Sequence, residues 1–158
     1  MKAVGIVPAR LESQRLPGKA LIDICGLPMV VHTCKRALKA ETLSDVFLAT
    51  DSEEIKKIAE KFDIKVIMTS KKHKNSSERA AEAAKSLDAD IIVNIQGDEP
   101  LLDPKAVDQL LQPFLDDSTT QVTTLMQQIE NPDDYYDSNV VKVVVTQSGH
   151  AMYFSRSC

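Results

Sequence analysis

The chain has 158 residues, 43% of them hydrophobic and 27% charged, which is typical of a single soluble domain over residues 1–158. Its formal net charge of −4 argues against binding to nucleic acid or to anionic membranes, because both require an excess of positive charge. It has three cysteines without a C-x-x-C pair and no apolar run of the ~20 residues that a membrane span requires. We therefore expect a cytoplasmic protein with reduced thiols, no zinc site and no membrane insertion.

Short runs rich in Val and Ile alternate with segments of helical periodicity along most of the chain. The runs predicted to be buried parallel strands are 4–7, 46–49, 64–68 and 91–95. Apolar residues at helical spacing predict amphipathic helices around 30–38, 55–62 and 107–114. Cys34 falls on the apolar face of the first helix, where it would fill the core. This alternation predicts a doubly wound α/β fold, a mostly parallel sheet with helices on both faces.

Two of the helix starts carry capping signals. Asp51 followed by Glu54 predicts a capping box, and Asp103 followed by Pro104 predicts an N-cap with proline at the first helical position. Further along, residues 122–125, 140–145 and 152–154 are expected to be strands, the first two as antiparallel edges, and 131–137 a polar connection.

In a sheet of this kind, ligands bind beyond the carboxyl ends of the strands. The segments that follow the predicted strands are 8–19, 50–51, 69–79 and 96–100. We therefore expect the functional residues in these four segments.

The first of these segments is basic. It carries Arg10, Arg15 and Lys19 and the hydroxyl of Ser13 directly after the first strand. It has neither the G-x-G-x-x-G pattern nor a P-loop, so phosphates would be bound by the three cations and by loop amides. The alternative is a solvated basic loop that binds no ligand.

A carboxylate follows the most hydrophobic strand, in Gln96-Gly97-Asp98-Glu99-Pro100. Mg²⁺ prefers oxygen ligands and usually binds through one or two carboxylates plus substrate phosphates, which suits Asp98. Gly97 would allow close approach of the backbone. The alternative is a turn in which Asp98 caps the chain or is solvated.

The segment 72–79 is a polar loop that contains His73 and leads into a further helix. Ser76 or Ser77 can cap that helix, and this interpretation requires no ligand. His32 and His150 are not expected to be catalytic.

Together these motifs resemble the 3-deoxy-manno-octulosonate cytidylyltransferases, also called CMP-Kdo synthetases. The segments that carry the resemblance are Ile6-Val7-Pro8-Ala9-Arg10, Ser13-x-Arg15-Leu16-Pro17-Gly18-Lys19, Ala49-Thr50-Asp51, Val93-Asn94-Ile95-Gln96-Gly97-Asp98-Glu99-Pro100, Val141-Lys142-Val143-Val144 and Tyr153-Phe154-Ser155-Arg156. The resemblance implies a nucleotide-diphospho-sugar transferase-like fold. It also implies transfer of CMP from CTP to the acidic sugar Kdo for lipopolysaccharide synthesis, with release of pyrophosphate.

The resemblance also assigns roles to individual residues. Those implied to bind the nucleotide are Pro8, Ala9, Arg10, Ser13, Arg15, Lys19, Ser77 and Arg79. Gln96 and Arg156 are implied to face the sugar, and Asp98 to bind Mg²⁺ as the cofactor. Arg10, Lys19 and Asp98 are implied to be catalytic.

The chain departs from the family pattern at two places. Ser76-Ser77-Glu78-Arg79 replaces a family stretch Gly-Thr-Glu-Arg, so that Ser77 keeps the hydroxyl and the glycine is lost. Family members continue beyond Arg156, so we expect this chain to be the N-terminal portion of a longer protein that forms a homodimer at full length. Two alternatives stay open: a synthetase for a sialic-type nine-carbon acid, and a truncated, non-catalytic nucleotide-binding remnant.

Overall fold

The computed structural model describes residues 1–12 and 16–158, so Ser13 and Arg15 of the basic loop lie outside the described residues. The chain forms two compact units, Met1–Gln121 and Val122–Cys158. The single domain over residues 1–158 stays a prediction, because compactness alone does not show which parts fold independently. None of the helices in the described residues has the length and the hydropathy required to cross a membrane.

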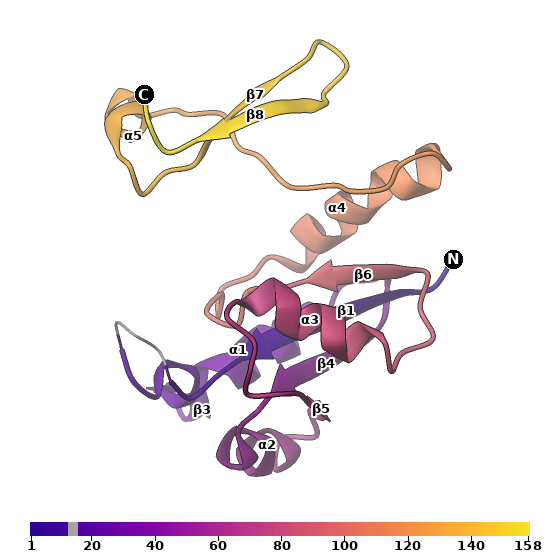
Figure 1. Cartoon of the computed structure of the whole chain (residues 1–158), viewed down its shortest axis with the longest axis vertical. Helices are drawn as coiled ribbons and strands as arrows, with labels where there is room; N and C mark the ends of the chain where they lie inside the picture. Colours follow the sequence, from indigo (N-terminus) through magenta and orange to yellow (C-terminus); the bar gives the residue numbers. More distant parts are fainter. Residues whose placement is uncertain (13–15) are drawn as a thin grey trace. The chain divides into compact units, whose positions relative to one another are not determined.

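The first unit is built on a parallel sheet whose four strands lie in the order β5-β4-β1-β6 (Figure 1). The strands are β1 (Ala3–Ala9), β4 (Leu43–Thr50), β5 (Lys65–Met68) and β6 (Ile91–Asn94). All seven residues of the central strand β1 are buried, as expected for a strand covered on both faces. The four strands predicted for this part of the chain are confirmed.

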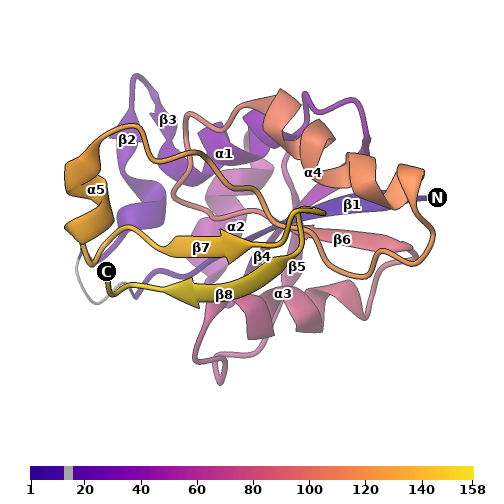
Figure 2. The ribbon, with the colours of Figure 1, turned by 90° about the horizontal axis from the view of Figure 1, so that it is seen from above.

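Helices cover both faces of this sheet (Figure 2). They are α1 (Met29–Ala37), α2 (Glu53–Glu60), α3 (Ser76–Ala84) and α4 (Pro104–Asp116). Side chains of α1, α2 and α4 share the larger apolar cluster, whereas α3 packs Ala80 and Ala83 against Ile6 and Ala49 in a second cluster. The predicted doubly wound α/β fold is confirmed, and fully buried Cys34 belongs to the core as expected.

Two short elements connect β1 to α1. The 3₁₀ helix η1 (Lys19–Leu21) is followed by a hairpin of β2 (Asp23–Ile24) and β3 (Leu27–Pro28). Gly18 adopts the left-handed conformation with φ 70°, which turns the chain into η1. No pattern in the sequence predicted this hairpin.

The second unit contains α5 (Pro132–Tyr136) and the antiparallel pair β7 (Lys142–Val145) and β8 (Ala151–Ser155). The strand predicted at 122–125 is wrong: these residues pair with no strand among the described residues, and Val122 is 87% exposed. β-branched residues favour a strand only where a neighbouring strand accepts their backbone hydrogen bonds. The polar connection predicted at 131–137 contains helix α5 instead, which Asn131 caps by accepting a hydrogen bond from the Asp133 amide.

Candidate functional site

A pocket of about 550 Å³ opens in the first unit beyond the carboxyl ends of β1 and β6. The chain runs from β1 through β4 to β5 on one side and returns to β6 on the other, so the pocket lies where the strand order reverses. Its walls come from residues 8–10, 16, 19–20, 73–76, 79 and 96–98 together with Met29. Three of the four segments that the sequence analysis singled out therefore meet in one pocket.

The first wall is the end of β1 and the basic loop. Pro8 and Ala9 close the strand, and the exposed side chain of Arg10 follows them into the pocket lining. The Gly18 amide donates a 3.0 Å hydrogen bond to the Leu11 carbonyl, which brings the two ends of the loop together. Lys19 lies at the start of η1 and lines the pocket.

The second wall is the segment after β6, and Gly97 lets it approach β1. A Cβ atom on Gly97 would lie 2.8 Å from the Pro8 carbonyl oxygen, closer than any side chain tolerates. The buried Thr33 hydroxyl of α1 lies 3.3 Å from the Gly97 carbonyl and donates a hydrogen bond to it. The expectation that Gly97 permits a close backbone approach is confirmed, and the adjacent Asp98 lines the pocket as a result.

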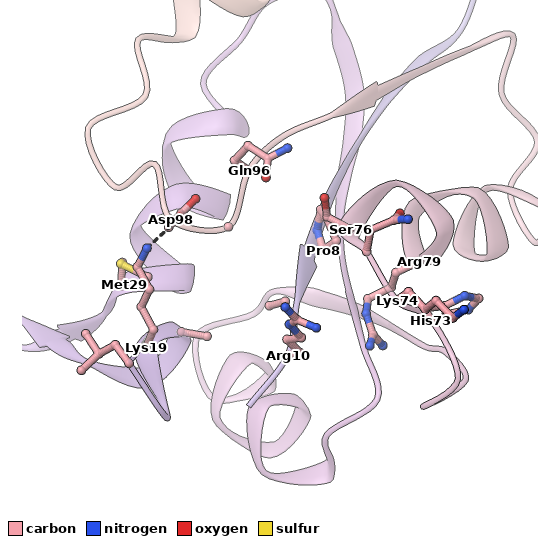
Figure 3. A pocket seen from close by; sticks show the side chains of 15 residues that line it. Pro8, Arg10, Lys19, Met29, His73, Lys74, Ser76, Arg79, Gln96 and Asp98 are labelled. Carbon is pink, nitrogen blue, oxygen red and sulfur yellow. Dashed lines mark hydrogen bonds and ion pairs between the residues drawn. The ribbon is translucent and has the colours of Figure 1, made fainter. Parts of the chain in front are cut away.

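An ion pair joins these two walls (Figure 3). The Lys19 Nζ atom lies 2.6 Å from Asp98 Oδ2, and the two side chains are 37% and 47% exposed. A pair this accessible to water contributes little to folding stability. Asp98 is the only acid among the described lining residues, which also include Arg10, Lys19, Lys74 and Arg79, so the lining is basic in an acidic protein. Such a concave basic surface attracts anions.

The third wall is the segment that leads into α3. Asn75 caps this helix, since its side-chain oxygen accepts a 2.8 Å hydrogen bond from the Glu78 amide, while Glu78 in return accepts one from the Lys74 amide. The prediction that Ser76 or Ser77 caps this helix is therefore wrong, because the helix already begins at Ser76. Ser76 is the first helical residue and lines the pocket, whereas Ser77 is exposed and lies outside the pocket lining.

Arg79, expected to bind the nucleotide, also lines the pocket, but its guanidinium is held within the fold. The residue is 3% exposed, and its Nη2 and Nη1 atoms donate to Asp51 Oδ2 at 2.9 Å and to Thr69 Oγ1 at 2.6 Å. The capping box predicted from Asp51 and Glu54 is wrong, because Ser52 caps α2 instead. The ion pair between Arg79 and Asp51 was not predicted from the sequence, because the two residues are far apart in the chain.

A second polar contact of the same wall joins His73 to Glu82 of α3. His73 Nε2 forms a hydrogen bond with the Glu82 carboxylate, which also accepts a 2.9 Å hydrogen bond from the Ser70 amide. The hydrogen bond from His73, and secondarily that from the Ser70 amide, lower the pKa of Glu82 below its ordinary value. His73 lines the pocket, a position that its polar sequence context alone did not reveal.

Comparison with known families gives a match to the cytidylyltransferases over residues 4–158. This chain belongs to the cytidylyltransferase family. This match confirms the cytidylyltransferase part of the resemblance found from the motifs.

The relatives of this cytidylyltransferase chain include curated 3-deoxy-manno-octulosonate cytidylyltransferases. Those of Chloroherpeton thalassium and Geobacter metallireducens are each 46% identical to it over 99% of its length. The chain spans 65% and 62% of these two relatives. A solved structure of CMP:2-keto-3-deoxy-manno-octonic acid synthetase in complex with CTP shares 41% identity and a TM-score of 0.96, covering 99% of this chain and 65% of that one.

The donor set of the cytidylyltransferase pocket fits Mg²⁺ brought in by a nucleotide better than a metal held by protein alone. Within residues 1–12 and 16–158, no group of three or more His, Cys, Asp and Glu side chains could hold a metal ion. Mg²⁺ commonly binds one or two carboxylates, with phosphate oxygens and water as its other ligands. The half-exposed Asp98 carboxylate in the lining provides one such ligand.

Arg156, expected to face the sugar, lies in the second unit. Its guanidinium donates hydrogen bonds of 3.1 and 3.2 Å to the carbonyls of Ser138 and Asn139. These two residues form the turn that precedes β7. Its role toward a sugar stays a prediction.

Proposed function

We propose that the chain carries the nucleotide-binding part of a 3-deoxy-manno-octulosonate cytidylyltransferase, which transfers CMP from CTP to Kdo and releases pyrophosphate. The observation that carries the proposal is the Lys19–Asp98 ion pair on the wall of a basic pocket at the reversal of strand order. The two relatives with 46% identity have this name, and the solved structure with a TM-score of 0.96 was determined with CTP.

In this proposal the cations of the first wall bind the triphosphate. Arg10 is exposed, and no ion-pair partner for it is found among the described residues, so its guanidinium is available for bidentate contact with phosphate oxygens. Lys19 adds a point charge on the same wall, and Arg15 and the Ser13 hydroxyl belong to the same loop. The backbone of Pro8 and Ala9 would then lie next to the cytosine.

Asp98 would hold Mg²⁺ together with the triphosphate in this proposal. Bound there, the metal would neutralise phosphate charge and polarise a phosphoryl oxygen as a Lewis acid. Lys19 keeps the carboxylate oriented through its 2.6 Å contact. The pocket thus has both charges that a nucleotide–metal complex requires.

The chemical step needs positioning and charge stabilisation rather than a covalent intermediate. The anomeric hydroxyl of the sugar acid would attack the α-phosphorus of CTP and lose its proton to solvent, and the bond from this phosphorus to the oxygen that bridges the α- and β-phosphates would break. Arg10 and Lys19 would stabilise the charge that develops on the leaving group. Gln96, exposed beside Asp98 in the lining, is our candidate for contact with the sugar.

The test has two parts. Calorimetric titration with Mg²⁺ present should show that the chain binds CTP more tightly than ATP or GTP, whether or not it turns over. A pyrophosphate-release assay with CTP should then favour Kdo over N-acetylneuraminic acid. Binding of a purine triphosphate as strong as that of CTP would reject the cytidylyl assignment. Preference for the nine-carbon acid would favour the sialic-type alternative, and CTP binding without turnover would favour the nucleotide-binding remnant.

A further inference from the structure

The hydrogen bonds of the pocket wall formed by residues 73–76 run to helix α3, at Glu78 and Glu82. His73, Lys74 and Asn75 precede the helix and Ser76 begins it, and all four line the pocket. Figure 3 shows three of these side chains, those of His73, Lys74 and Ser76, around Arg79. The position of this wall therefore depends on what holds the first turns of α3 against the sheet.

Two side chains of α3, three residues apart and hence on one face of the helix, connect it to the ends of the strands. Arg79 donates to Asp51, directly after β4, and to Thr69, directly after β5. Glu82 accepts from the Ser70 amide and from His73. The carboxyl ends of two strands, the helix and the loop between them are thus joined by one continuous polar network.

The charge of Arg79 is already compensated within this network. The Arg79 and Asp51 side chains are 4% and 18% exposed, so the pair is shielded from water far more than the Lys19–Asp98 pair. A guanidinium paired at 2.9 Å contributes little net positive potential to a phosphate ligand nearby. Arg10 and Lys74, exposed on the same pocket, are better placed to contribute it.

We infer that Arg79 is a positioning residue that acts through Asp51 and Thr69 to fix the 73–76 wall for the nucleotide, rather than a direct nucleotide ligand. The inference rests on the proposed function only in naming CTP as the ligand. Asp51 does not line this pocket, but the inference predicts that it affects nucleotide affinity.

The two roles predict opposite effects of neutralising Asp51. Asp51→Asn is nearly isosteric and keeps an acceptor for Arg79, so the fold should persist, whereas Arg79→Ala would leave a shielded carboxylate without its partner and risk unfolding. If Arg79 positions the wall, Asp51→Asn and Arg79→Lys should each weaken CTP binding roughly tenfold, and the double variant should be no weaker than the weaker single one. If Arg79 binds CTP directly, freeing it from Asp51 should leave the affinity unchanged or raise it.

The matched control is Glu53→Gln, which removes one negative charge two residues away at the start of α2. Its CTP affinity, measured by calorimetry in the same buffer, gives the purely electrostatic effect of losing one acid. An affinity of Asp51→Asn equal to or higher than that of Glu53→Gln would overturn the inference, even if Asp51→Asn lowered the melting temperature.

Hydrogen exchange separates this inference from the proposed function. In both Asp51→Asn and Arg79→Lys, exchange at the amides of Thr69 and Ser70 should accelerate roughly tenfold, while amides in the middle of β1 keep the parent rates. If the parent chain failed to bind CTP, the proposed function would be rejected, and accelerated exchange would still support the positioning role. Unchanged exchange at these two amides would reject that role whatever the ligand.

Discussion

The close approach of Gly97 to β1 makes Gly97→Ala an informative substitution. The new Cβ would lie 2.8 Å from the Pro8 carbonyl oxygen, a backbone atom that cannot rotate away, and the next atoms, Val7 Cγ1 and Ala9 Cβ, are at 3.7 and 3.8 Å. The clash has therefore a single partner. It can be relieved only by moving the 96–98 segment away from β1, by about half an ångström.

The expected loss of stability is the difference between two effects. Overpacking of this kind costs about 1–3 kcal/mol. Alanine in place of glycine restricts the unfolded chain and returns about 0.4–1 kcal/mol, because Gly97 does not have a left-handed φ. We expect a net loss of about 1–2 kcal/mol and a decrease of the melting temperature by roughly 2–8 °C. Since Pro8 and Asp98 both line the pocket, CTP affinity should decrease about tenfold.

Thermal denaturation and calorimetric titration with CTP and Mg²⁺ measure the two effects separately. Gly5→Ala is the matched control, because the three atoms nearest to a Cβ there are side-chain methyl groups of Leu43, Ile95 and Val46, at 3.1–3.2 Å. It adds the same methyl group to β1 inside the core, so it should lower the melting temperature and leave CTP affinity intact. If Gly97→Ala lost stability but bound CTP as the parent does, the close approach would have no part in shaping the site.

Other substitutions test the remaining walls and the core. Asp98→Asn should keep the melting temperature within about 2 °C, because the ion pair is exposed, and should abolish the Mg²⁺ dependence of CTP binding; a retained Mg²⁺ dependence would remove Asp98 from the metal site. Lys19→Ala should weaken CTP binding roughly tenfold at low salt and less at high salt, and a salt-independent loss would argue against a charge contact. Ser76→Ala should weaken CTP binding at least about threefold while Ser77→Ala does not, a contrast that calorimetry resolves and that would reverse if Ser77 were the contact. Burial raises the pKa of the Cys34 thiol to about 12, so at pH 8 a thiol reagent should label the two exposed cysteines of the folded chain and reach Cys34 only after denaturation; rapid labelling of all three would contradict its burial.

The sheet and its helices could be predicted from the sequence because their signals are local. Continuous Val- and Ile-rich runs mark β1, β4, β5 and β6, and apolar spacing marks the helices between them. The helix start at Asp103 was also predicted correctly, since the cap and the following proline are adjacent in the chain. The position of the pocket followed from the fold class, because ligands in such sheets bind beyond the strand ends.

The wrong predictions concern choices that tertiary contacts decide. Asp51 has the right type and spacing for a helix cap, but the buried Arg79 pairs with it and leaves the cap to Ser52. Ser76 and Ser77 are the same residue type, so the sequence does not show which of them faces the pocket. The N-cap at Asn75 decides this in the folded chain. At 122–125 the apolar pattern was present and a partner strand was not.

The strand order also determines when the site can form during folding. β1 pairs with β4 at Ala3↔Leu43, but its pairing with β6 at Ala3↔Ile91 must close a loop more than twice as long. The pairing of β1 with β6 is thus expected to be the later event, and the crevice that brings Gly97 and Asp98 to Pro8 exists only after it. A nucleotide would then find no site on the partly folded chain. Added CTP should slow the unfolding of the finished protein and leave the rate of its folding unchanged.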